Sequence, residues 1–209
     1  MTKILLILSS PRGTASLSAR FALELTERLR SCGIGTSLLV RDLADPPLPH
    51  VDVSYINGRT RNADERSRAE TQAVELAEAL IGELQLADIV IIASSMVNFS
   101  VSSVLKTWFD YLIWPGITIK YTNRGFEGLI TEKKVFFVAA ADSIYLDSGL
   151  TAHDFQMTYL RHVLNFLGLQ DLKEIRIERI TSGPVGAQVA MDKASAVINN
   201  LVGTIAQQL

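Results

Sequence analysis

KILLILSSPRGTASLS, residues 3–18, is the stretch that decides the fold of this chain. Its first half is apolar at five consecutive positions, residues 4–8, which is typical of a strand buried on both faces. A turn rich in hydroxyl groups follows. From Ser16 to Cys32 an apolar residue then recurs at every fourth position, which predicts an amphipathic helix. A buried strand that leads directly into a helix predicts a parallel sheet.

The same alternation continues along the chain. Apolar, β-branched runs predict strands at Lys3 to Ser9, Thr36 to Val40, Asp88 to Ser94, Lys134 to Ala140 and Leu172 to Ile177. Periodic stretches predict helices at Ser16 to Cys32, Asp64 to Leu86, Ser100 to Ile113, His153 to Leu167 and Met191 to Gln207. Because parallel strands need crossover helices, this order indicates a doubly wound α/β fold. We expect one domain, residues 1–209, with a five-stranded parallel sheet of order 2-1-3-4-5 between two helical layers.

Two long connections interrupt this alternation. Residues 42–63 contain three prolines and no periodic pattern, and residues 114–133 mix glycines with aromatic residues. Structureless connections of this length are uncommon in a compact domain. We therefore expect both connections to be functional or to lie at an interface.

The composition excludes several classes of protein. A hydrophobic fraction of 48% excludes a disordered chain, and a net charge of -2 gives no field that would attract nucleic acid. The single cysteine, Cys32, excludes an internal disulfide, and the three histidines lack the spacing of metal ligands, so we expect no metal. No apolar run is long enough for a bilayer, and the short run near Met1 is followed by a turn instead of a cleavage site. We expect a cytoplasmic protein without membrane contact.

The chemistry is expected at the carboxyl ends of the strands. Ligands of open α/β sheets bind where the strand order reverses, which here is between the first and third strands. The loop after the first strand, residues 9–18, offers serine hydroxyls and a helix N-terminus, which favour a phosphate group. Ser16 also fits a simple N-cap, and Arg12 fits either a phosphate contact or a solvated loop arginine. The sequence lacks a Walker A motif, a Gly-x-Gly-x-x-Gly turn and a Gly-x-Ser-x-Gly elbow, so we expect neither ATP hydrolysis, dinucleotide binding of the Rossmann type nor a serine hydrolase.

Several segments together resemble a known family. These are residues 3–10, Val40-Arg41-Asp42-Leu43 with Pro47-Leu48-Pro49, Met96-Val97-Asn98-Phe99, and Lys120-Tyr121-Thr122-x-x-Gly125-x-Glu127-Gly128-Leu129 followed by Lys133-Lys134. At matching spacings they are similar to the FMN-dependent NADH-azoreductases, within the flavodoxin-like NAD(P)H:quinone reductases. The resemblance implies a flavodoxin-like fold and bound FMN.

The resemblance also implies a set of site residues. The FMN phosphate would be bound by Ser10, Ser16, Leu17 and Ser18. The ring and ribityl chain would lie against Met96, Val97, Asn98 and Phe99, and the pyrimidine end against Ala140, Ala141, Asp142 and Ser143. Tyr121, Phe126 and Tyr145 would belong to the substrate pocket, with the long loop roofing the site of the partner in a homodimer.

The sequence departs from the family pattern at two places, one residue and one segment of four residues. Val97 stands where the family usually has an aromatic residue, so one wall of the site should be smaller. The segment Ala140-Ala141-Asp142-Ser143 stands where a Ser-Arg-Gly-Gly-like loop is common. An ionised Asp142 facing the ring would lower the reduction potential of the flavin.

The implied activity is two-electron transfer from NADH or NADPH to quinones and azo compounds. One pocket that serves both substrates in turn predicts ping-pong kinetics, with the chemistry on the cofactor and no assigned catalytic side chain. Two alternatives stay open: a one-electron carrier of flavodoxin type, and a binding module that has lost flavin. Reduction of the bound flavin by NADH would distinguish the enzyme from both.

Overall fold

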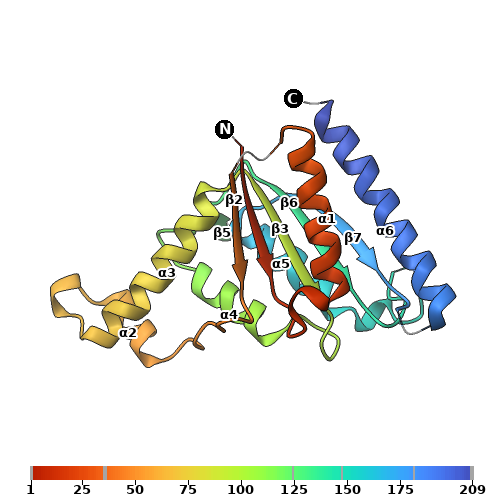
Figure 1. Cartoon of the computed structure of the whole chain (residues 1–209). Coiled ribbons are helices and arrows are strands. Elements are labelled where there is room, and N and C mark those ends of the chain that lie inside the picture. The colour runs from red at the N-terminus through yellow and green to blue at the C-terminus, as the bar shows by residue number, and fades with distance from the viewer. Residues whose placement is uncertain (1, 35–36, 124, 147, 181, 208–209) are drawn as a thin grey trace.

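A parallel sheet forms the centre of the molecule. The computed structural model describes residues 2–34, 37–123, 125–146, 148–180 and 182–207. In these residues the main sheet has the order β2-β1-β3-β6-β7 (Figure 1). Its strands are β1 (Lys3–Leu8), β2 (Ser37–Asp42), β3 (Ile89–Ser95), β6 (Lys134–Ala140) and β7 (Asp171–Ile177). The expected order is confirmed; Thr36, the expected start of the second strand, lies outside the described residues.

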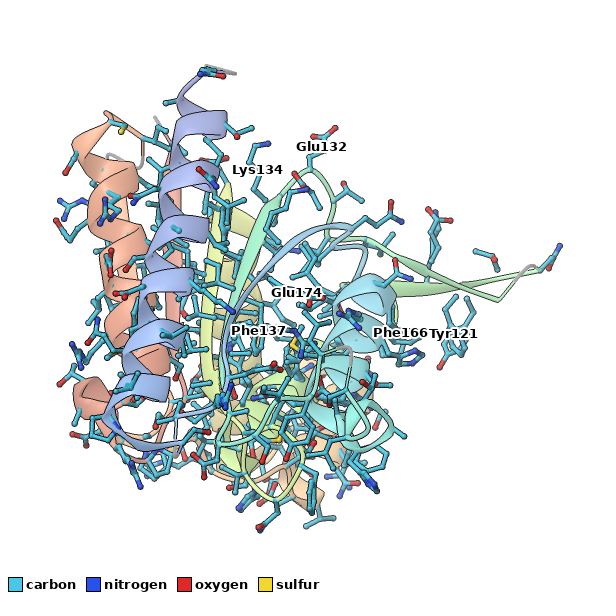
Figure 2. All side chains as sticks on the ribbon, turned by 90° about the vertical axis from the view of Figure 1, so that its right-hand side faces the viewer. Tyr121, Glu132, Lys134, Phe137, Phe166 and Glu174 are labelled. Carbon is cyan, nitrogen blue, oxygen red and sulfur yellow. The ribbon has the colours of Figure 1, made fainter. Side chains whose placement is uncertain are left out.

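Helices cover both faces of this sheet. On one face lie α1 (Leu17–Ser31) and α6 (Gly183–Ala206); on the other lie α3 (Arg68–Leu86), α4 (Ser103–Leu112) and α5 (Phe155–Leu167) (Figures 1 and 2). The side chains of β1 alternate between the two cores. Ile4 and Leu6 pack under α1, whereas Leu5 and Ile7 pack under α3. Burial on both faces explains why the strand is apolar at every position from Ile4 to Leu8.

Residues 42–63, in which the sequence shows no periodic pattern, contain regular structure. The segment contains a helix, α2 (Val53–Thr60), whose N-cap Asp52 accepts a hydrogen bond from the Tyr55 N–H at 3.0 Å. Gly58 lies so close to α3 that an added Cβ would be 2.8 Å from the Glu70 carbonyl. Only Tyr55 and Gly58 of this helix are buried, so its apolar pattern is weak. The sequence pattern therefore does not predict the helix, which is held by its contact with α3.

The second long connection, residues 114–133, also contains regular structure. It forms an antiparallel hairpin of β4 (Ile119–Thr122) and β5 (Gly125–Gly128). The base of the hairpin packs on the end of α5, where a Cβ on Gly128 would be 2.1 Å from the Gly168 nitrogen. Its far end projects away from the body of the molecule, and Tyr121 lies on the projecting part (Figure 2).

Helix ends differ from their expected positions for local reasons. The helix α3 begins at Arg68 because Ser67 and Glu70 form a reciprocal capping box. The helix α6 begins at Gly183, eight residues before the expected Met191, because Pro184 is acceptable in a first turn. No helix in the described part of the chain is long and apolar enough to cross a membrane.

Candidate cofactor-binding site

A cavity of about 260 Å³ opens at the carboxyl edge of the sheet, beside the ends of β1, β3 and β6. This is the place where the strand order reverses. The loops after these strands supply most of its lining, and the loop after β7 adds one residue. The lining residues are Ser10, Pro11, Arg12, Ala15, Ser16, Leu17, Ser95, Met96, Val97, Ala140, Ala141, Asp142 and Ile180.

Buried hydroxyl groups fix the first of these loops. The Ser9 hydroxyl donates to the Ala93 carbonyl at 2.8 Å, and the Ser102 hydroxyl donates to the Ser9 carbonyl at 2.9 Å. The Ser10 side chain accepts from the Arg12 N–H at 3.3 Å. These bonds tie the loop to β3 and α4, so the cavity is formed before any ligand enters.

The start of α1 fits an anionic ester. The Ser16 hydroxyl accepts from the Ala19 N–H at 3.2 Å and lies 2.8 Å from the Ser18 hydroxyl. The Arg20 N–H donates to the Ser16 carbonyl, but within the described residues no acceptor is found for the N–H groups of Leu17 and Ser18. Such free donors at a helix N-terminus bind phosphate. Ser16 therefore acts as the N-cap and also lines the cavity, so its two expected roles are compatible.

The loop after β3 is a tight turn across the cavity from this helix. The Met96 N–H donates to the Ala140 carbonyl at 2.8 Å, which ties the ends of β3 and β6 together. Val97 and Ser100 exchange two backbone hydrogen bonds, and the residues between them, Asn98 and Phe99, have φ values of 46° and 71°. Two positive φ values between paired residues are those of a type I′ turn. For Phe99 this conformation is strained, as is common where a backbone contacts a ligand.

The structure brings most of the predicted cofactor residues together. Those that line the cavity are Ser10, Ser16, Leu17, Met96, Val97, Ala140, Ala141 and Asp142. Ser18 is fully buried behind Ser16, with its hydroxyl 3.2 Å from that of Ser95. Asn98 and Phe99 are exposed on the turn beside the cavity, and the Phe99 ring lies 6.1 Å from that of His153. Ser143 is half-buried and follows the lining segment.

None of the three predicted substrate residues lines this cavity. Tyr121 and Phe126 are on the hairpin, 69% and 57% exposed, and neither lines this cavity. Tyr145 is buried, and its carbonyl accepts from the Thr151 hydroxyl at 2.6 Å. The assignment of these three residues stays a prediction.

Sequence reasoning missed part of the lining. Pro11 and Ala15 in the first loop, Ser95 at the end of β3 and Ile180 after β7 were not singled out. Ile180 was within reach of the rule that ligands bind beyond strand ends, since it comes three residues after β7. Arg12, for which two interpretations were open, lines the cavity. The described residues contain no group of His, Cys, Asp or Glu arranged to hold a metal ion.

The sheet order and the serine-lined cavity at its switch point define a protein of the flavodoxin-like class. A family model described as "Flavodoxin-like fold" matches residues 2–202. The chain is 44% identical over 202 residues to FMN-dependent NADH:quinone oxidoreductase 1 of Burkholderia lata, which covers 97% of this chain and 98% of the relative. It is 43% identical over 199 residues to FMN-dependent NADH:quinone oxidoreductase 2 of Rhizobium etli, with 95% and 96% covered.

Solved structures show the same fold. An azoreductase from Bacillus anthracis superimposes with a TM-score of 0.87 at 24% identity, with both chains fully covered. An FMN-dependent NADH-azoreductase from the same species, solved in complex with FMN, gives a TM-score of 0.86 at 24% identity, with 97% of this chain and 100% of the other covered. The chain belongs to the flavodoxin-like family that includes the FMN-dependent NADH:quinone oxidoreductases.

Proposed function

We propose that this protein binds FMN and reduces quinones and azo compounds with NADH, in two successive transfers of two electrons each. The observation that carries the proposal is the serine-lined cavity at the strand-order reversal, with free N–H donors at the start of α1. The relatives at 44% and 43% identity, both named as FMN-dependent NADH:quinone oxidoreductases, support it. The cytoplasm, where NADH turns over, is the location that fits this activity.

The phosphate end of FMN belongs at the first loop. In the proposed complex the N–H groups of Leu17 and Ser18 and the hydroxyls of Ser10 and Ser16 donate to phosphate oxygens. Arg12 adds a positive charge at the rim, because it lines the same cavity. A cavity of about 260 Å³ is small for all of FMN, so we expect the flat ring to lie at its open end.

The ring end belongs between two backbone segments. Residues 96–99 and 140–143 are held together by the hydrogen bond from Met96 to Ala140, so their spacing is fixed before FMN binds. When bound, FMN supplies the redox chemistry, taking a hydride from NADH and passing it to the acceptor. The protein contributes orientation and a partly apolar wall, and solvent supplies the proton that a reduced quinone needs.

We also propose a homodimer in which the hairpin of each chain covers the cavity of its partner. The Tyr121 and Phe126 rings contact each other in a tilted arrangement, and so do those of Phe126 and Phe166, with centroid distances of 5.0 Å for both pairs. Both hairpin rings are nonetheless largely exposed, on an element that projects from the body of the molecule (Figure 2). Exposed aromatic side chains of this kind are enriched at protein interfaces.

Steady-state kinetics test the proposed reaction. With NADH and a benzoquinone both varied, a single pocket used in turn predicts parallel lines in double-reciprocal plots. Each substrate at high concentration should also inhibit competitively against the other. Intersecting lines would mean that both substrates are bound together, which this proposal does not allow.

A further inference from the structure

A second cavity, of about 600 Å³, lies beside the first. It is formed between the segment that follows β6 and the first turns of α6. Its volume is within the range of about 300–1,000 Å³ that is usual for small-molecule sites. Ile144, Leu146, Val185 and Val189 line it, and each of these apolar side chains is exposed in this structure.

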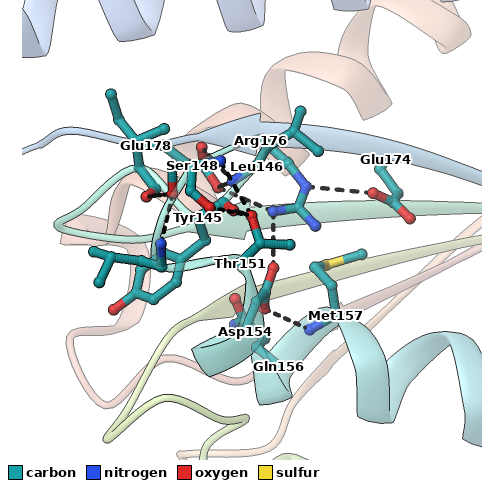
Figure 3. Close-up of polar contacts among 12 residues, drawn as sticks. Tyr145, Leu146, Ser148, Thr151, Asp154, Gln156, Met157, Glu174, Arg176 and Glu178 are labelled. Carbon is teal, nitrogen blue, oxygen red and sulfur yellow. Dashed lines mark hydrogen bonds and ion pairs between the residues drawn. The ribbon is translucent and has the colours of Figure 1, made fainter.

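The charges that line this cavity leave a net positive surplus. Arg176 is neutralised, since it contacts Asp154 at 2.9 Å, Glu178 at 2.9 Å and Glu174 at 3.3 Å (Figure 3). Partial burial alone would lower the pKa of Arg176, but the hydrogen bonds that it donates to Asp154 and Glu178 raise it overall. Among the described residues of the lining the one acid is Glu178, which pairs with Arg176 and accepts a hydrogen bond from the Leu146 N–H at 3.3 Å.

Two other cations face the same cavity without such partners. Arg179 and Lys193 line it, and in the part of the chain that the structure describes neither forms an ion pair. The nearest acid along α6, Asp192, accepts a hydrogen bond from Gln188 and is not part of the lining. The cavity therefore offers an apolar surface together with two free positive charges.

Neighbouring residues line the two cavities. Ile180 lines the first cavity and Arg179, the residue before it, lines the second. In the segment after β6, Asp142 lines the first cavity and Ile144, two residues later, lines the second. A molecule that lies across these two segments would reach both cavities.

We propose that the second cavity binds the adenosine diphosphate half of NADH while its nicotinamide lies at the first. The adenine ring packs on the apolar residues of the loop and of α6, and the pyrophosphate contacts Arg179 and Lys193. This assignment rests on the proposed function, because it names a subsite for the reductant of that reaction. The subsite would contact NADH but not a quinone, because a quinone has no adenosine diphosphate group.

Binding of ADP-ribose tests the subsite without any redox step. The double variant Arg179→Ala with Lys193→Ala should bind ADP-ribose about tenfold more weakly in calorimetric titrations of the FMN-incubated protein, because two charge-assisted contacts are lost. Arg30→Ala with Lys173→Ala removes the same net charge from exposed sites elsewhere and should bind as the original chain does. Equal affinities in the two double variants would overturn the proposal.

Val185→Glu provides a second variant that leaves folding intact, since this side chain is 79% exposed. A carboxylate placed there should also weaken ADP-ribose binding, by repelling the pyrophosphate. Unchanged binding in this variant would likewise count against the assignment.

Kinetics show whether the site serves the reductant. The Arg179/Lys193 variant should raise KM for NADH about tenfold and leave KM for the quinone unchanged. Its rate of flavin reduction by reduced nicotinamide mononucleotide, which lacks the adenylate, should equal that of the original chain. ADP-ribose that binds without competing against NADH would overturn the assignment. If NADH fails to reduce the original chain, the proposed function fails, and the calorimetric result still decides whether the cavity binds the nucleotide.

Discussion

Ser16 shows how one residue serves both folding and binding. Its hydroxyl caps α1 by accepting from Ala19, and the same side chain lines the cavity at the start of that helix. Ser67 caps α3 in the same way but lies in neither cavity lining. Comparing Ser16 with Ser67 therefore distinguishes the effect of a helix cap from an effect on cofactor binding.

We predict that Ser16→Ala and Ser67→Ala each lower the free energy of unfolding by about 1 kcal/mol, the usual effect of losing an N-cap hydroxyl. Only Ser16→Ala should also weaken FMN binding, by about tenfold, because a phosphate donor is lost with the cap. Urea unfolding of the FMN-free proteins and quenching of FMN fluorescence measure the two effects. Equal FMN affinity in both variants would remove Ser16 from the phosphate site.

Several residues of the cavity lining could be predicted from the strand ends alone. Ser10, Met96 and Ala140 lie at or within two residues of the ends of β1, β3 and β6, so the topology alone brings them to one edge. The turn at Asn98 and Phe99 was not predictable in the same way. Positive φ values are rare for phenylalanine, and this turn depends on its hydrogen bonds between Val97 and Ser100.

At the scale of elements, α3 owes its start to a capping box. The Glu70 carboxylate accepts from the Ser67 backbone N–H at 2.8 Å and pairs with Arg61 at 3.0 Å. The Ser67 backbone hydrogen bond, assisted by Arg61, lowers the pKa of Glu70 below its ordinary value of 4.5. A group whose pKa is lowered on folding adds stability above its unfolded pKa, and that stability is lost as the pH falls through the folded value.

Glu70→Gln should therefore lower Tm at neutral pH, and the difference from the original chain should shrink once the pH falls below 4.5. Glutamine keeps the hydrogen-bond acceptor of the capping box, so the comparison isolates the charge. Thermal unfolding followed by circular dichroism between neutral and acidic pH measures it. A difference in Tm that stays constant over that range would show that charge is not the cause.

Elements with strong patterns were predicted, and those that depend on tertiary contacts were not. The three inner strands, β1, β3 and β6, are recognised by consecutive apolar residues, since helices cover both faces of the sheet. The helix α2 and the hairpin lack such runs. They are held instead by close backbone contacts, between Gly58 and α3 and between Gly128 and the end of α5. The presence of a glycine in the sequence does not predict such a contact.

In the whole molecule, the hairpin of β4 and β5 is the element whose exposed aromatic residues have no explanation within one chain. It carries two exposed aromatic side chains away from the cavity of its own chain. The proposed homodimer gives these rings a partner to cover. It also completes each cavity with residues from the other chain.

We predict that the protein sediments as a dimer and that Tyr121→Asp weakens the dimer at least tenfold, because a carboxylate would be buried in the interface. The matched control is Leu86→Asp, at the last residue of α3 and 64% exposed, which should leave the dimer intact. Sedimentation velocity over a range of protein concentrations measures both. A monomeric original chain would contradict this arrangement.

In the proposed function, the cavity at the carboxyl edge holds FMN in a form that NADH can reduce. The most direct measurement is anaerobic stopped-flow absorbance of the FMN-loaded protein. On mixing with NADH, the flavin absorbance near 450 nm should bleach, and a second mixing with a benzoquinone should restore it. A protein that takes up no FMN, or whose bound FMN keeps its full absorbance with excess NADH, would not have the proposed function.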